Sequence, residues 1–389
     1  MTSGGTESLL MAVKTAREWG RLQKPGAGLP EMVLPSTAHP AFEKAAHYFG
    51  VKSVRVPVGE DFRAQVDLME AAITPNTVLL VGSAPSYPQG VVDPILGLAA
   101  VAQKHHILFH VDACVGGFML PFVRKLGYPI PDFDFRVPGV TSISADLHKY
   151  GYTAKGASVI LYRSHALRQY QFFVDTDWAG GIYASPAMAG SRPGGAIAAA
   201  WAVLNFLGEE GYLEIVRKVM QATDRLKAGI TKIDGVHILS NPEMSVLALA
   251  SDQHNIYDIG DEMTLKGWYM DRQQFPPSLH VTLNYAHAEV IDGFLRDLSH
   301  AVEKTHQPSW HKFRDAFLLR VARFLVRFLP EKLVSNLMGR ASSLLGVEGS
   351  ALPQRSAAMY GMMGTLPNRG DLKTLVLDLL DQMFSVEAK

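Results

Sequence analysis

The stretch Ser142-Ile-Ser-Ala-Asp-Leu-His-Lys-Tyr150 predicts a short buried strand that ends in a His148-Lys149 pair. Burial disfavours the charged form of a lysine and thereby lowers its pKa. A lysine with a lowered pKa is a nucleophile that can condense with an aldehyde. We therefore expect Lys149 to be a reactive amine at the edge of a buried sheet. The alternative is an ordinary surface lysine that follows a strand.

The apolar runs on either side of this stretch predict the fold. Val78-Leu-Leu-Val-Gly82 and Ile107-Leu-Phe-His-Val111 are short and continuously apolar, which is typical of parallel strands buried on both faces. Helix-period segments separate such runs. We expect strands at 31–35, 53–56, 77–82, 107–112, 142–145 and 157–162, and helices at 9–19, 41–49, 68–72 and 94–104. Together they indicate a doubly wound α/β domain, with a mostly parallel central sheet and helices on both faces.

The second half of the chain has a different pattern. A long helix near residues 196–229 breaks the alternation, and strand-like segments follow at 236–239, 245–250 and 279–282. We therefore expect a large domain at residues 1–225 and a smaller α+β domain at residues 226–389.

Residues 311–346 contain a basic amphipathic segment. Arg320, Arg323 and Arg327 share one helical face, opposite a broad apolar face. A helix of this kind can lie on a membrane surface. It can equally pack on its own domain or on a subunit partner.

Composition excludes several classes of function. The 389 residues include 37 Lys plus Arg and 37 Asp plus Glu, whereas a nucleic-acid surface normally needs a basic excess, so no nucleic-acid partner is expected. Cys114 is the only cysteine, which excludes an intrachain disulfide and a cysteine metal cluster and suits a reducing compartment. We find no signal peptide and no apolar run of about 18 residues, and expect a cytoplasmic protein without a metal.

Three further features suggest a site for a phosphorylated aromatic ligand. Asp112 ends an apolar strand, where α/β sheets place their ligands, although it could equally cap a helix or join a structural ion pair. Ser3-Gly-Gly-Thr6 precedes a helix, and glycines at a helix N-terminus favour a phosphate, although many such segments are simply turns. His39 follows a strand and could stack on an aromatic ring, or cap the helix that begins at Ala41.

In this order and setting, these features resemble the sphingosine-1-phosphate lyase family of fold-type I pyridoxal-5′-phosphate (PLP) enzymes, which is related to the group II decarboxylases. The resemblance runs across nearly the whole chain. It is carried by Met1-Thr-Ser-Gly-Gly-Thr-Glu-Ser8, Val111-Asp-Ala-Cys-Val-Gly-Gly117, Gly139-Val-Thr-Ser-Ile-Ser-Ala-Asp146, His148-Lys-Tyr-Gly-Tyr152, Phe172-Phe-Val-Asp-Thr-Asp-Trp178 and Gly190-Ser-Arg-Pro-Gly-Gly195.

The resemblance implies a role for each matching residue. Lys149 is expected to hold PLP as a Schiff base, Asp112 to pair with the pyridine nitrogen, and His39 to stack on the ring. The remaining cofactor-binding residues are expected to be Gly5, Thr6 and His148 at the phosphate, together with Ser83 and Cys114. Lys155, Tyr183 and Arg192 match positions near the substrate and the subunit boundary. The candidate proton carriers are Lys149, His39, Lys155 and Tyr183.

The resemblance also implies a reaction and a partner. The expected reaction is cleavage of a sphingoid-base phosphate to a long-chain aldehyde and phosphoethanolamine, in a homodimer with shared active sites. The family carries a segment before the Thr-Ser-Gly-Gly turn that this sequence does not contain. Two alternatives therefore stay open: a PLP-dependent amino-acid decarboxylase, and a truncated, inactive homologue that acts by dimerisation or interaction.

Overall fold

A computed structural model describes residues 1–26 and 28–306, and near the C-terminus Ala357, Tyr360, Lys373, Val376, Leu377, Leu380 and Asp381. The chain forms two compact units. The first contains Met1–Arg225, Leu239–Leu247 and Thr282–Glu289, and the second contains Leu226–Ile238, Ala248–Val281 and the described residues from Val290 onward. The basic segment expected at 311–346 lies outside the described residues.

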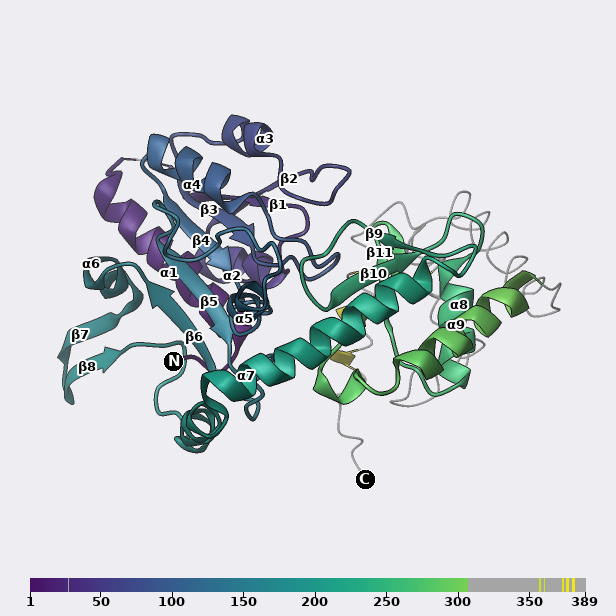
Figure 1. The fold of residues 1–389 in the computed structure, drawn as a ribbon. Helices are drawn as coiled ribbons and strands as arrows, with labels where there is room; N and C mark the ends of the chain where they lie inside the picture. The colour runs from purple at the N-terminus through teal and green to yellow at the C-terminus, as the bar shows by residue number, and fades with distance from the viewer. Residues whose placement is uncertain are drawn as a thin grey trace, which may run out of the picture. The chain divides into compact units, whose positions relative to one another are not determined.

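A six-stranded sheet forms the centre of the first unit (Figure 1). Its order is β2 (Lys52–Val56), β1 (Glu31–Pro35), β3 (Thr77–Ser83), β4 (Leu108–Asp112), β5 (Ser142–Asp146) and β6 (Ser158–Tyr162). The first five strands are parallel, and β6 runs antiparallel to β5. This pairing confirms the expected mostly parallel sheet. The strands β1, β3, β4 and β5 are buried at every position, as is typical of parallel strands that are covered on both faces.

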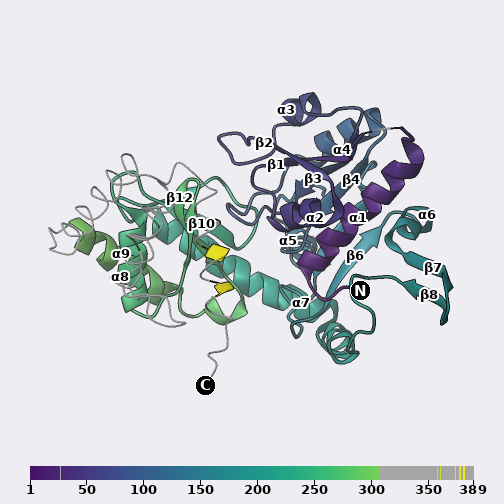
Figure 2. The same ribbon diagram turned by 180° about the vertical axis from the view of Figure 1, so that it is seen from behind.

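Helices cover both faces of this sheet, as the two opposite views show (Figures 1 and 2). On one face, α1 and α2 share a hydrophobic core with Leu79 and Val81. On the other face lies α4, and a Cβ at Gly82 would come within 2.9 Å of Ile95 Cδ1, so glycine here permits close helix packing. The helices of this part of the chain are α1 (Gly5–Gln23), α2 (Ala41–Phe49), α3 (Val66–Ala71), α4 (Ile95–Lys104), α5 (Leu120–Lys125), α6 (His165–Arg168) and the 3₁₀ turn η1 (Gln169–Gln171).

Two further elements complete this half of the chain. A two-stranded antiparallel hairpin, β7 (Phe173–Trp178) and β8 (Gly181–Ser185), was not predicted from the sequence. The long α7 (Gly195–Ile230) was predicted, but it consists of two helical segments that meet at Gly208, where φ is 56°.

A second sheet has the order β11 (Asp271–Gln274), β12 (Pro277–Thr282), β10 (Val246–Ala250) and β9 (His237–Leu239). The helical elements around it in sequence are α8 (Ile256–Leu265), η2 (Tyr285–His287) and α9 (Ile291–His306). In the second unit, a buried ion pair joins Arg272 Nη2 to Asp261 Oδ1 at 2.5 Å, and the N–H of Ala357 donates to Asp261 Oδ2 at 3.0 Å. Ala357, one of the described residues near the C-terminus, therefore packs into this unit.

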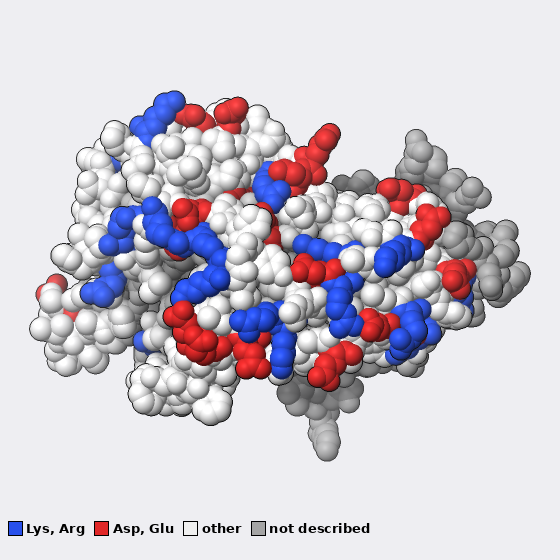
Figure 3. Space-filling model, in the orientation of Figure 1, with Lys and Arg blue, Asp and Glu red and all other residues white. Residues whose placement is uncertain are grey.

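The surface of the described residues carries both signs of charge. On the face in Figure 3, basic and acidic side chains alternate, in keeping with the equal numbers in the sequence. None of the helices in the described ranges combines the length and the apolar character that crossing a bilayer requires.

Candidate active site

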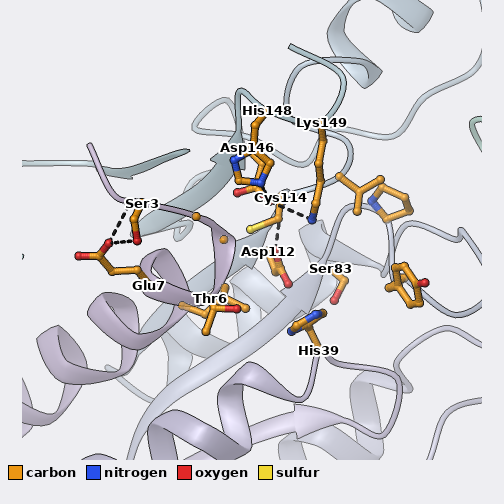
Figure 4. Close-up of a pocket in the computed structure, with 16 residues that line it drawn as sticks. Ser3, Thr6, Glu7, His39, Ser83, Asp112, Cys114, Asp146, His148 and Lys149 are labelled. Atoms are coloured by element: carbon orange, nitrogen blue, oxygen red, sulfur yellow. Dashed lines mark hydrogen bonds and ion pairs between the residues drawn. The ribbon is translucent and has the colours of Figure 1, made fainter. Parts of the chain in front are cut away.

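The carboxyl ends of the parallel strands bring the predicted residues together. Ser83 ends β3 opposite Asp112, which ends β4 opposite Ser144 on β5. A cavity of about 370 Å³ lies here, within the roughly 300–1,000 Å³ typical of small-molecule sites. Its walls include the predicted Gly5, Thr6, His39, Ser83, Asp112, Cys114, His148 and Lys149 (Figure 4).

Lys149 lies in the wall of this cavity, with its side chain 34% exposed. Its Nζ is 2.9 Å from Asp146 Oδ2. The expectation of a lowered pKa is wrong: burial does lower the pKa of Lys149, but the negative charge and hydrogen bond of Asp146, with a smaller contribution from Asp112, raise it above its ordinary value. The Lys149 amine is therefore an ammonium ion paired with Asp146, and it must lose a proton before it can act as a nucleophile.

Asp146 was not predicted as a site residue. Its side chain is only 1% exposed, and Ser158 Oγ donates to Oδ1 at 2.6 Å. Nε2 of His148 lies 3.7 Å from Oδ2. The sequence did contain a signal for this residue, because Asp146 ends β5 three positions before Lys149 and so lies at the same edge of the sheet as Asp112.

Asp112 lines the cavity and also stabilises the turn after β4. Its Oδ1 accepts hydrogen bonds from the N–H of Cys114 at 3.0 Å and from Ser144 Oγ at 3.2 Å, so one oxygen fixes the turn after β4. The carboxylate also lines the cavity. Burial and the nearby Asp112 and Asp146 charges raise the pKa of Cys114 well above its usual value, so this residue is an uncharged thiol in the wall.

His39 is held in a defined protonation state. Its Nδ1 accepts the N–H of Ala41 at 3.1 Å, so the predicted cap of α2 is present. Burial lowers the pKa of His39, which is therefore neutral near pH 7 and carries its hydrogen on Nε2. The ring also lines the cavity, where it can donate a hydrogen bond.

The N-terminal turn of α1 forms another wall. The first amides of a helix have no partners within the helix and attract anions. A Cβ at Gly5 would lie 2.7 Å from Asp146 Oδ2 and 2.9 Å from Cys114 Sγ, so only glycine fits there. Ser3 and Glu7, which were not predicted, fasten this turn: the N–H and Oγ of Ser3 donate to Glu7 Oε2 at 2.7 and 2.6 Å.

These groups fit PLP. The cofactor presents an aldehyde, a pyridine nitrogen and a phosphate, and the cavity offers an amine at Lys149, a carboxylate at Asp112 and a helix N-terminus at Gly5. In addition, Nδ1 of His148 is buried and has no hydrogen-bond partner among the described residues. A buried polar atom of this kind normally has a partner, so it indicates room for a ligand group.

Three predicted residues lie outside the walls of this cavity. Tyr183 is half exposed on β8, and Lys155 is exposed in the turn before β6. Arg192 donates from Nη1 to the backbone carbonyl of Met1. The described chain therefore brings together the expected cofactor residues, but not the expected substrate residues.

Comparison with known proteins identifies the family to which this chain belongs. Residues 1–250 match the model of the pyridoxal-dependent decarboxylase conserved domain. The sphingosine-1-phosphate lyase of Arabidopsis thaliana is 42% identical over 384 residues, which cover 99% of this chain and 63% of that protein. Sphingosine-1-phosphate lyase 1 of Rattus norvegicus is 51% identical over 305 residues, or 78% of this chain and 53% of that protein.

A solved structure agrees with these relatives. The sphingosine-1-phosphate lyase of Burkholderia pseudomallei superposes with a TM-score of 0.77 at 42% identity, covering 85% of this chain and 74% of that one. The chain spans between about half and two thirds of the length of the two curated relatives. It belongs to the pyridoxal-dependent decarboxylase family and, within that family, is related to the sphingosine-1-phosphate lyases.

Proposed function

We propose that this chain forms the catalytic part of a PLP-dependent carbon–carbon lyase, which cleaves sphingoid-base phosphates to a long-chain aldehyde and phosphoethanolamine. One observation carries the proposal: Lys149, Asp112 and the glycine turn of α1 line a single cavity, in a chain whose relatives at 42% and 51% identity are named sphingosine-1-phosphate lyases. These relatives favour a lyase over the alternative of an amino-acid decarboxylase.

The cavity residues divide the task of holding the cofactor. Lys149 would anchor it covalently, the first amides of α1 and His148 would hold its phosphate, and the ring of His39 would cover one face. Asp112 would keep a proton on the pyridine nitrogen. When bound, PLP supplies a sink for the electron pair released as the carbon–carbon bond breaks.

The cavity also restricts which residues can move protons. Among the residues that line it in the described chain, Lys149 is the one lysine. His39 can donate from Nε2, but it cannot accept a proton at Nδ1 without breaking the cap of Ala41. We therefore assign proton transfer to the Lys149 amine and hydrogen-bond donation to His39.

A homodimer is part of the proposal. Large apolar side chains are exposed on the β7–β8 hairpin and on the first segment of α7, among them Ile182 at 77%, Trp201 at 69% and Phe206 at 88%. Such surfaces on a folded protein usually mark an interface. We assign a second copy of this chain as the occupant, and assign Tyr183, Arg192 and Lys155 to the substrate at the resulting subunit boundary.

We also propose a cytoplasmic location with peripheral membrane contact through residues 311–346. The basic amphipathic pattern of Arg320, Arg323 and Arg327 supports contact with an anionic lipid surface. The amphiphilic character of the proposed substrate is consistent with such contact.

A product assay tests the proposed reaction. The full chain with PLP should release fatty aldehyde and phosphoethanolamine from sphinganine 1-phosphate, and Lys149→Ala should abolish this release. Lys104→Ala, which changes an exposed lysine on α4, is the matched control and should retain it. Release of CO₂ from amino acids without any aldehyde product would favour the decarboxylase alternative.

A further inference from the structure

Asp146 is a further carboxylate of the cavity wall, and both of its oxygens have partners. Asp146 and Ser158 are directly opposite each other in the β5–β6 pair, and Ser158 Oγ donates to Asp146 Oδ1 at 2.6 Å. Ser158 is itself fixed by two backbone hydrogen bonds with Thr2, of 2.8 and 3.0 Å. Asp146 therefore connects the sheet, the segment before α1 and the reactive lysine.

The other oxygen of Asp146 faces the cofactor site. Oδ2 lies 2.9 Å from Lys149 Nζ and would be 2.7 Å from a Cβ at Gly5. A carboxylate that is 1% exposed has lost most of its hydration, so a nearby cation strongly favours its charged form. The ammonium of Lys149 is that cation here, and the same carboxylate oxygen lies beside the turn that we expect to bind the phosphate.

We propose that Asp146 is a positioning residue, which holds the Lys149 amine in the cavity as an ammonium ion and must release it before the amine can react with the aldehyde of PLP. This inference rests on Lys149 as the attachment point of the cofactor. In the attachment step, the ammonium first loses one proton. A carbon–nitrogen bond then forms at the aldehyde carbon, and the aldehyde oxygen leaves as water.

Several titratable groups surround the Lys149 amine. The charges of Asp146 and Asp112 raise the pKa of Lys149 against the effect of burial, and His39 and His148 are the imidazoles near the same groups. Nε2 of His148 is 3.7 Å from Asp146 Oδ2. Burial lowers the pKa of His148 although the charge of Asp146 opposes the shift, and the charges of Lys155 and Lys149 lower it further, so Lys149 is the cation that balances Asp146 near pH 7.

The pH dependence of cofactor attachment tests this proposal. The full chain is prepared free of cofactor and mixed with PLP at a series of pH values. Attachment is then trapped with borohydride and quantified by mass spectrometry. Asp146→Asn removes the charge but keeps the shape. Without the carboxylate charge, the Lys149 amine loses its proton more easily. The midpoint of attachment should therefore move toward lower pH by about one unit or more, and attachment near neutral pH should become about tenfold faster.

Two further variants make the result decisive. Ser158→Ala frees the carboxylate without neutralising it and should give a smaller shift in the same direction, so it serves if Asp146→Asn does not fold. Asp67→Asn is the control: it removes an exposed carboxylate on α3, outside the walls of this cavity, and should leave the midpoint unchanged.

The outcomes separate this proposal from the proposed function. An unchanged midpoint in folded Asp146→Asn, with normal attachment at Lys149, would overturn the positioning role alone. Failure of the wild-type chain to attach PLP at Lys149 at every pH would overturn the positioning role and the proposed function together.

Discussion

At the scale of single residues, the site depends on charges whose partners are not obvious in the sequence. Lys149 was predicted correctly as a cavity residue, but the direction of its pKa was wrong, because burial was considered without a counter-charge. Asp146 was missed because a strand-end carboxylate becomes significant only when its neighbours are known. Burial can be predicted from an apolar run, whereas an ion pair at 2.9 Å depends on side-chain geometry.

His110 provides a test of the buried sheet at this scale. It lies inside β4, where its ring nitrogens contact Ser142 Oγ at 2.8 Å and Ser144 Oγ at 3.2 Å. Burial lowers its pKa from 6.5 to about 4, although the charge of Asp112 opposes the shift. Between these values the unfolded chain binds a proton that the folded chain does not. The contribution of His110 to the free energy of unfolding should therefore decrease by up to about 3 kcal/mol as the pH falls below 6.5.

Denaturant unfolding at several pH values measures this effect. His110→Gln should be less stable at neutral pH and should show a weaker loss on acidification than the wild type, whereas the exposed His47→Gln should behave like the wild type. Asp93, whose pKa is raised to about 6 by burial, contributes in the opposite direction, so the comparison is made between variants. Equal pH dependence in His110→Gln and the wild type would contradict this explanation.

At the scale of elements, the sequence predicted most of the first unit. β1 and α2 match the expected ranges at both ends, and α7 matches within one residue at each end. β1 is buried at every position, and α2 buries the apolar face that its periodicity predicts. The β7–β8 hairpin was missed because nearly all of its side chains are exposed in the single chain, so its sequence lacks the alternation by which a half-buried strand is recognised.

The N-terminal turn of α1 yields a prediction at this scale. Gly5→Ala should place a methyl group 2.7 Å from Asp146 Oδ2 and thereby displace the wall of the cavity. We expect a stability loss of about 1–3 kcal/mol and at least about tenfold weaker PLP binding. Gly4→Ala is the adjacent control, because its Cβ would meet only His148 Cε1, at an ordinary 3.6 Å. Thermal unfolding and PLP titration measure both effects, and equal behaviour of the two variants would refute the close fit.

At the scale of the whole molecule, exposed apolar surface predicts self-association. Trp201→Glu on α7 and Ile182→Glu on β8 should each weaken dimerisation by at least about 30-fold, the effect of losing a residue that dominates an interface. Leu96→Glu, on the exposed side of α4, is the control. Light scattering across a concentration series measures the dissociation constant. A wild-type chain that stays monomeric at high concentration would exclude the homodimer.

The central claim is that the ε-amine of Lys149 carries the cofactor. The most direct measurement is borohydride reduction of the full chain with bound PLP, followed by proteolysis and mass spectrometry of the labelled peptide. We predict a single labelled lysine, at position 149, and no label in Lys149→Ala. Stable labelling of another lysine, with Lys149 unmodified, would contradict the assignment of this cavity.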